Sequence, residues 1–247
     1  MQKRLVRKLD LEVALARIEP HPCPKANLEQ YTIPPDVAAE ILYVAAYMNN
    51  DIAKKTILDL GCGTGRLALG SVLLGAREAV GIDIDKTAIR VAANHAKRLG
   101  LKAKTHWIVA DIAAVRGPFD TVLQNPPFGV QRRRADRSFL KKALEVGKHT
   151  YSLHKSSNTE ELRSILNSSE RDARPRNPTS ARPSPFLRRF IAEHRGKITA
   201  VYRMPMTIPR IFEFHTKQRH KFLVDLYVID TEEPKAPTTS RLNQKIY

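Results

Sequence analysis

Residues 56–65, Thr-Ile-Leu-Asp-Leu-Gly-Cys-Gly-Thr-Gly, decide the fold predicted for this 247-residue chain. The apolar run TILDL is typical of a buried strand, and three glycines at alternate positions follow it. Glycine lets the backbone turn sharply and lets a ligand approach closely. We therefore predict a strand over 56–60, a tight ligand-binding loop at 61–65 and a helix over 66–74.

The same alternation of strand and helix continues along the chain. Further strands are predicted over 79–84, 105–109, 120–124, 150–154, 197–204 and 222–229, and further helices over 3–19, 35–49, 85–99 and 137–146. Strands that alternate with crossover helices form a parallel sheet covered on both faces. The pattern therefore predicts an α/β fold with a doubly wound sheet.

The chain divides into one large unit and two appendages. We predict a single domain over 1–230, in which 1–50 form N-terminal helices and a lid, and a tail over 231–247. Residues 157–185 are rich in Ser, Pro and Arg and poor in large apolar side chains, which is typical of a basic insertion or mobile loop.

Positive charge is the strongest compositional signal. The chain carries 42 Lys and Arg against 25 Asp and Glu, a net charge of +17, and residues 131–195 alone carry 16 basic and 7 acidic groups. A surplus concentrated in this way attracts a polyanion, so nucleic acid is the favoured partner. A basic surface without a dedicated partner is the alternative.

Other compositional features narrow the class of protein. Two cysteines, Cys23 and Cys62, cannot form a disulfide scaffold, and neither they nor the eight histidines suggest a metal site. No apolar run reaches the roughly 18–20 residues that span a bilayer. We therefore expect a cytoplasmic protein that needs no metal and does not associate with a membrane.

The glycine loop favours one cofactor over another. A dinucleotide fingerprint, G-x-G-x-x-G, requires a small residue where this chain has Arg66. The acidic start, D-x-G-x-G-x-G, resembles instead the S-adenosylmethionine loop of class I methyltransferases. That resemblance implies that Asp59, Gly61, Gly63 and Gly65 bind the amino-acid half of this cofactor.

Acidic residues lie at the carboxyl ends of the next two strands. Asp83, at the carboxyl edge where open α/β sheets bind ligands, can accept hydrogen bonds from ribose hydroxyls, and Ile84 can cover the adenine. Asp85 is predicted as the N-cap of the following helix. Asp111, with Ile112, stands where class I enzymes meet the adenine amino group, although a loop cap is its alternative role.

Two further segments are candidates for the site. Gln30, Tyr31 and Thr32 lie between predicted helices and are interpreted as a lid over the cofactor, or as simple turn residues. Asn125-Pro126-Pro127-Phe128 follows the fourth strand, which neighbours the first in a doubly wound sheet. This second segment is the predicted catalytic centre.

The catalytic tetrapeptide suits methylation of an exocyclic amine. The Asn125 side-chain oxygen and the Pro126 carbonyl can each accept one N–H, which directs the nitrogen lone pair at a methyl group. Proline fixes φ and removes competing N–H groups, and Phe128 offers a ring on which a flipped-out base can stack. Catalysis would then rest on orientation rather than on a strong base.

The tetrapeptide resembles the [Asn/Asp/Ser]-Pro-Pro-[Tyr/Phe/Trp] signature of amino-group methyltransferases. That signature serves adenine N6, guanine N2 or cytosine N4, and the glutamine side chain of release factors. The basic charge argues against a protein substrate. A guanine N2 or DNA adenine methyltransferase and a catalytically silent RNA-binding subunit remain alternatives.

Taken over nearly the whole chain, the sequence resembles the methyltransferase-like protein 5 family, including its archaeal members. The matching segments are Leu28–Tyr31, Asp59–Gly65, Asp83–Asp85, Asn125–Gly129, Ala135–Arg137, Phe139-Leu140, Tyr151–Ser156, Phe214-His215 and Val224–Leu226. A threonine that some members carry just before the second helix is Ile33 here, with Thr32 one position earlier.

The resemblance implies a seven-stranded, mostly parallel sheet with an antiparallel last strand, and N6-methylation of one adenosine in small-subunit ribosomal RNA. It implies that Gln30, Gly61, Asp83, Asp111 and Asn125 contact cofactor or substrate. It also implies a possible heterodimer with a small zinc-containing activator protein. Candidate RNA contacts, each with a solvated surface group as its alternative, are Arg132, Arg133, Arg134, His154, Lys155, His215 and Lys217.

Overall fold

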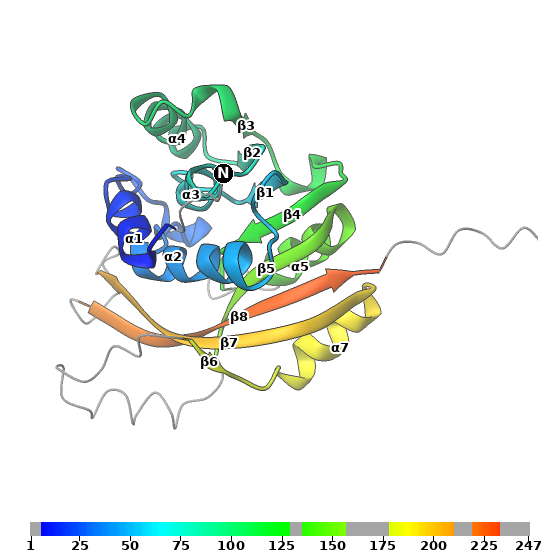
Figure 1. Ribbon diagram of the computed structural model, residues 1–247. Helices are drawn as coiled ribbons and strands as arrows, with labels where there is room; N and C mark the ends of the chain where they lie inside the picture. Colours follow the sequence, from blue (N-terminus) through cyan, green and yellow to red (C-terminus); the bar gives the residue numbers. More distant parts are fainter. Residues whose placement is uncertain (1–5, 129–134, 157–177, 210–218, 233–247) are drawn as a thin grey trace, which may run out of the picture.

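The computed structural model describes residues 6–128, 135–156, 178–209 and 219–232, and eight strands within them form one sheet (Figure 1). The strands are β1 (Thr56–Leu60), β2 (Glu78–Asp83), β3 (Thr105–Val109), β4 (Phe119–Gln124), β5 (Gly147–Lys155), β6 (Thr179–Ser180), β7 (Gly196–Pro209) and β8 (Arg219–Thr231). Their order across the sheet is β3-β2-β1-β4-β5-β8-β7-β6.

One half of the sheet has parallel strands and the other half has antiparallel strands. β3, β2, β1, β4 and β5 pair in parallel, whereas β8 is antiparallel to both β5 and β7. The predicted doubly wound sheet with an antiparallel last strand is therefore confirmed. The predicted number of strands was too low by one, because Thr179 and Ser180 pair with β7 in a stretch too short and polar to signal a strand.

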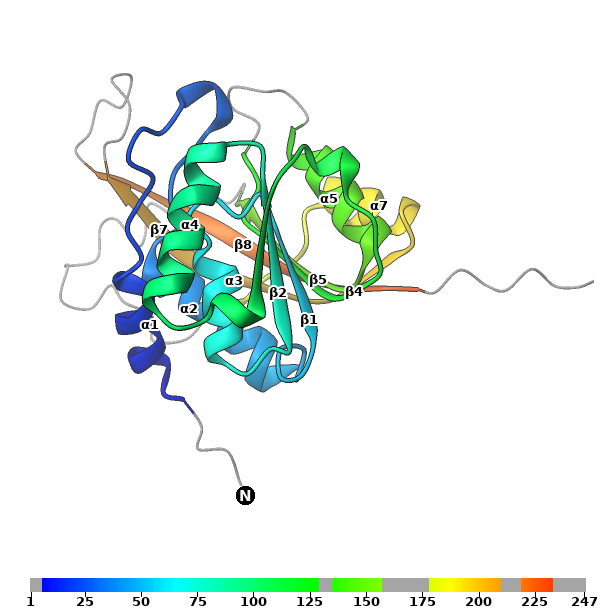
Figure 2. The same cartoon turned by 90° about the horizontal axis from the view of Figure 1, so that it is seen from above.

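Helices cover both faces of the sheet (Figure 2). α1 (Lys8–Ala16), α2 (Pro35–Tyr43), α3 (Arg66–Leu73) and α4 (Lys86–Arg98) lie on one face, and α5 (Ala135–Val146) and α7 (Pro185–Glu193) lie on the other. Neighbouring residues of β4 point to opposite faces, so Leu123 joins the core under α1–α3 and Val122 the core under α5. Burial on both faces explains why the strands read as continuous apolar runs.

Some boundaries differ from those predicted. α1 is shorter than the predicted helix over 3–19, and α2 is followed by a π-helical turn over Val44–Met48. α7 was not predicted at all, although Leu187 and Ile191 lie at helical spacing, because the Pro-rich stretch predicted as an insertion runs up to its first residue, Pro185. Ser184 caps it by accepting from the Leu187 amide, and Leu187 and Ile191 are buried.

The remaining expectations about organisation stay predictions. Most of the predicted insertion, residues 157–177, and most of the predicted tail, residues 233–247, lie outside the described residues. In the described part of the chain, no helix is long and apolar enough to cross a membrane.

Candidate active site

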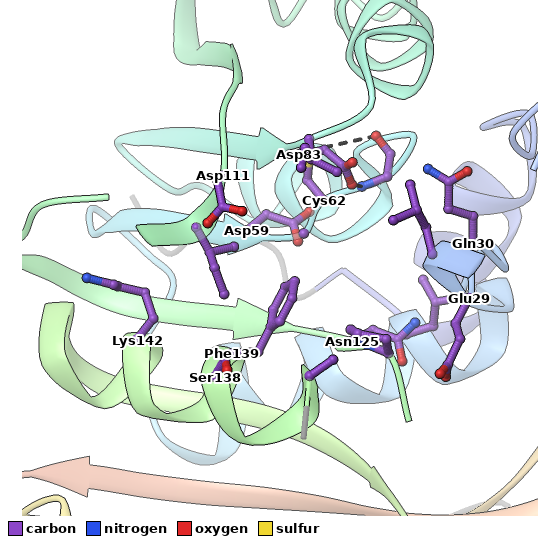
Figure 3. A pocket seen from close by; sticks show the side chains of 18 of the residues that line it. Glu29, Gln30, Asp59, Cys62, Asp83, Asp111, Asn125, Ser138, Phe139 and Lys142 are labelled. Atoms are coloured by element: carbon purple, nitrogen blue, oxygen red, sulfur yellow. Dashed lines mark hydrogen bonds between the residues drawn. The ribbon is translucent and has the colours of Figure 1, made fainter. Parts of the chain in front are cut away.

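A cavity of about 640 Å³ lies at the carboxyl edge of the parallel strands (Figure 3). Its walls come from the loops after β1, β2, β3 and β4, from α5, and from residues 17–34 between α1 and α2, which we call the lid loop. A volume of this size suits a cofactor-sized molecule. The predicted site residues that line it are Gln30, Tyr31, Thr32, Asp59, Gly61, Gly63, Asp83, Ile84, Asp111, Ile112, Asn125 and Pro127.

The glycine loop lies under this cavity in a conformation that requires glycine. Gly61, Gly63 and Gly65 have φ of 73°, 52° and 82°, in the left-handed region. The loop is fixed to β2, because the amides of Gly61 and Cys62 both donate to the Ile82 carbonyl at 2.9 Å. A Cβ at Gly61 would lie 2.6 Å from the Phe139 ring, whereas a Cβ at Gly63 would meet nothing within 4 Å.

Asp83 supports the loop and keeps acceptor capacity towards the cavity. Its Oδ2 accepts from the Gly63 amide and its Oδ1 from the Asp85 amide, both at 2.8 Å. A carboxylate has about four lone-pair positions, so further hydrogen bonds from hydroxyl groups are possible. Burial raises the pKa of Asp83, which shows that the fold holds this carboxyl group at a cost in solvation.

Asp85 acts as the N-cap of α4, as predicted. Its Oδ1 accepts from the Thr87 amide at 2.7 Å, and its Oδ2 accepts from Gln30 at 3.1 Å and lies 3.0 Å from Lys25 Nζ. Burial acts to raise the pKa of Asp85, but the hydrogen bonds from Gln30, Lys25 and Thr87 outweigh it and hold the pKa well below its usual range. Asp85 therefore also ties the lid loop to α4.

Asp59 is buried behind the glycine loop. Its Oδ2 accepts from the Ala68 amide at 2.9 Å, and burial raises its pKa to about 7. The hydroxyl of the neighbouring Thr64 is buried in the cavity wall without a hydrogen-bond partner. An unpartnered buried hydroxyl at this position fits a polar ligand, and it supports the proposal that S-adenosylmethionine binds here.

Sequence reasoning missed several residues of the cavity. Thr64, Cys62 and Phe139 line it, and Figure 3 shows Phe139 projecting between Asn125 and Asp59. Nothing in the local pattern distinguishes Phe139 from an ordinary helix residue. Arg66, which argued against a dinucleotide, donates instead to the carbonyls of Ile18 and Ile33, at the two ends of the lid loop.

The lid loop reaches both ends of the site. Gln30 accepts from the Lys25 amide at 2.8 Å and donates to Asp85, while Thr32 Oγ1 accepts from the His21 amide at 3.2 Å. The Tyr31 hydroxyl donates to Asn125 Oδ1 at 3.1 Å. The residue after Gln30 thus contacts the predicted catalytic turn rather than the glycine loop.

The catalytic turn carries a cluster of aromatic rings. Phe128 stacks on Tyr31 with ring centroids 5.4 Å apart and meets Phe222 edge to face at 5.7 Å. Lys155, an expected RNA contact, is exposed, and its Nζ lies 5.9 Å from the centre of the Phe222 ring. A cluster of aromatic rings and an exposed lysine therefore adjoin the turn.

The other expected RNA contacts have different outcomes. His154 is only 6% exposed, and its Nε2 hydrogen-bonds Ser152 Oγ, which in turn accepts from Gln124. Burial lowers the pKa of His154 to about 4, so the side chain is neutral and internal, and the expectation of an RNA contact is wrong. Arg132, Arg133, Arg134, His215 and Lys217 lie outside the described residues.

Known proteins share the sequence and the architecture of this chain. The family model for ribosomal protein L11 methyltransferase (PrmA) matches residues 42–126. The rRNA N6-adenosine-methyltransferases METTL5 of Danio rerio and Drosophila melanogaster are 33% and 37% identical over 64% of this chain, which covers 79% and 76% of their lengths.

A crystal structure from Pyrococcus horikoshii, provisionally assigned as an RNA methyltransferase, has a TM-score of 0.76 and 33% identity, and the match covers 93% of this chain and all of that one. The predicted enzyme class and the cofactor S-adenosylmethionine are confirmed by these likenesses. The chain belongs to the METTL5 family of class I, S-adenosylmethionine-dependent RNA methyltransferases.

Proposed function

We propose that this protein methylates the N6 amine of one unpaired adenosine in small-subunit ribosomal RNA, in the cytoplasm. The observation that carries the proposal is the position of Asn125. It lies at the end of β4, across the cavity from the glycine loop and Asp83 (Figure 3). An amine held at this turn would face the ligand that the loop binds.

In the proposed reaction, Asn125 Oδ1 and the Pro126 carbonyl each accept one N–H of the adenine amino group. The amine lone pair is delocalised into the ring, and two acceptors outside the ring plane draw it out of conjugation. Phe128 stacks on the base, and the two prolines keep the turn rigid. The bound cofactor supplies an electrophilic methyl group, so the chain contributes orientation and exclusion of water.

We propose that the residues around the glycine loop hold the cofactor. Gly61, Gly63 and Gly65 give its amino-acid half a close approach to the backbone, with Asp59 behind them. Asp83 accepts from the ribose hydroxyls, and exposed Ile84 covers one face of the adenine. The lining residues assigned to the remaining contacts are Gln30, Thr32, Asp111, Ile112 and Asn125.

RNA would approach beside the turn, where Lys155 is exposed. We further propose that a small zinc-containing activator protein binds the open edge of the sheet. β3 is the edge strand there, and Ile108 and Val109 on it are 44% and 48% exposed. An edge strand with exposed apolar side chains is suited to pairing with another chain.

Product analysis tests the proposed function. The purified full chain, with and without the activator protein, is incubated with isotope-labelled S-adenosylmethionine and unmethylated small-subunit ribosomal RNA, and the nucleosides are separated by mass spectrometry. We expect label in N6-methyladenosine at one position. Label in N2-methylguanosine, in a DNA control or in a release-factor protein would assign the chain to another class of amino-group methyltransferase.

A further inference from the structure

The lid residue Tyr31 makes both contacts that the proposed function assigns to the target base. Its hydroxyl donates to Asn125 Oδ1 at 3.1 Å, and its ring stacks on Phe128 with an interplanar angle of 28°. Burial raises the pKa of Tyr31 well above its usual value, so the hydroxyl stays a donor, as the adenine amine is. Tyr31 thus presents to the turn an aromatic ring and one hydrogen-bond donor, the same two features that an adenine with its amino group would present.

The base cannot share this place with Tyr31. One face of the Phe128 ring is covered by Tyr31, and Phe222 meets the same ring edge to face at 5.7 Å. A planar base that stacks on the face of Phe128 now covered by Tyr31, while its amine reaches Asn125, would need the volume that the tyrosine ring fills.

We infer that Tyr31 occupies the target-base subsite in the free enzyme and leaves it when the adenosine enters. This inference rests on the proposed function and adds that Tyr31, a residue of the chain itself, competes with the target base for its subsite. The competitor keeps the two acceptors and the aromatic surface of the turn in place while no base is bound, and it makes entry of a base depend on displacing a matched group.

The lid loop has the anchors that such a movement needs. Arg66 holds its two ends through the carbonyls of Ile18 and Ile33, and Gln30 is bound to Asp85. Between these anchors, Glu29 adopts a left-handed conformation with φ of 51°, which is strained for a residue with a side chain. In the inferred movement, Tyr31 leaves the turn while the ends of the loop stay fixed.

A fluorine label on the ring tests the displacement directly. We would place 3-fluorotyrosine at position 31 of the full chain and record its fluorine NMR signal with S-adenosylhomocysteine and the RNA shown to be methylated. The control RNA has an abasic site in place of the target adenosine. The control label is placed at Tyr43, the last residue of α2, whose ring packs on Tyr47 in the turn that follows. We expect the signal at position 31 to shift with the intact RNA but not with the abasic RNA, and the signal at position 43 to stay unchanged with both.

Kinetics give a second measurement. Replacing Tyr31→Leu removes the hydrogen bond and the ring stacking that compete with the base, so we expect KM for the RNA to fall about three- to tenfold. Thermal unfolding of the variant is recorded in parallel. Tyr31→Phe keeps the ring and loses only the hydrogen bond, so its KM for the RNA should lie between those of Tyr31→Leu and the wild type.

Each outcome bears on the inference separately from the function. If the wild-type chain methylates the RNA but the label at position 31 does not respond, or responds equally to the abasic RNA, Tyr31 is not displaced by the base. A fall of tenfold or more in kcat for Tyr31→Phe at unchanged KM would make Tyr31 a positioning residue for Asn125 instead. If the wild-type chain methylates no adenosine, the proposed function itself fails and the inference with it.

Discussion

The amide of Gly63 donates to the carboxylate of Asp83 at 2.8 Å, so the loop after β1 and the end of β2 form one rigid unit. Because Asp83 both supports the glycine loop and faces the cavity, we expect Asp83→Ala to weaken binding of S-adenosylhomocysteine at least tenfold. Calorimetric titration measures this loss. RNA affinity, measured by fluorescence anisotropy, should stay near the wild-type value, and an equal loss of both affinities would contradict separate binding roles.

Asn125 is expected to matter for turnover more than for folding. Asn125→Ala removes one acceptor for the amine, and loss of an orienting interaction of this kind costs on the order of a hundredfold in rate. Single-turnover methylation with labelled cofactor measures the effect. Asn94→Ala, at an exposed position of α4, is the matched control and should keep wild-type activity. Undiminished methylation by Asn125→Ala would contradict the role of this side chain in orienting the amine.

RNA binding should be strongly salt-dependent, since the partner is a polyanion and the chain has a net charge of +17. Lys155→Gln is expected to weaken RNA binding a few-fold and to reduce the slope of log affinity against log salt by about one. The matched control is Lys104→Gln, because Lys104 is exposed just before the edge strand β3, whereas Lys155 ends β5 in the middle of the sheet. A slope unchanged by Lys155→Gln would remove this lysine from the proposed RNA surface.

The buried carboxyl group of Asp59 should make stability depend on pH. Its pKa is raised to about 7 by burial, whereas an aspartate in an unfolded chain titrates near about 4. Folding therefore favours the protonated form, and its contribution to stability is complete below about pH 4 and is lost as the pH rises to 7. Asp59→Asn keeps an acceptor for the Ala68 amide and does not titrate.

Urea unfolding at pH 4.5 and 7.5 tests this expectation. Relative to Asp59→Asn, the wild type should lose on the order of a few kcal/mol between the two pH values. Asp120→Asn is the control of opposite sign, since hydrogen bonds from Thr56 lower the pKa of Asp120 and its benefit is already complete at pH 4.5. Parallel pH curves for wild type and Asp59→Asn would mean that Asp59 is ionised throughout.

Gly61 and Gly63 offer a matched pair in one loop. Both have a positive φ, so alanine at either position should cost about 1–2 kcal/mol of folding free energy. Only at Gly61 would the new methyl group also meet the Phe139 ring, so Gly61→Ala should be the more destabilising, and adding Phe139→Ala should reduce its extra cost. Denaturant unfolding of the single and double variants measures this coupling; additive effects would rule out the contact.

The elements of the parallel half of the sheet could be predicted closely from the sequence. β1 and β3 have the predicted bounds, and β2 and β4 agree to within one residue, because their apolar runs are local signals. The weak points were α7, which directly follows a Pro-rich stretch, and β6, a strand of two residues. Both depend on packing against β7, which no local window contains.

The sequence by itself determined which segments meet at the cavity. The glycine loop, Asp83 and the Asn-Pro-Pro-Phe turn each lie at the carboxyl end of a strand, and parallel strands place such ends at one edge of the sheet. Only the tertiary structure decided that His154 is buried, that Arg66 anchors the lid loop and that Tyr31 contacts Asn125, 94 positions away. Periodicity reports which face of its own element a residue occupies, whereas these contacts depend on how separate elements pack, and that information is spread over the whole chain.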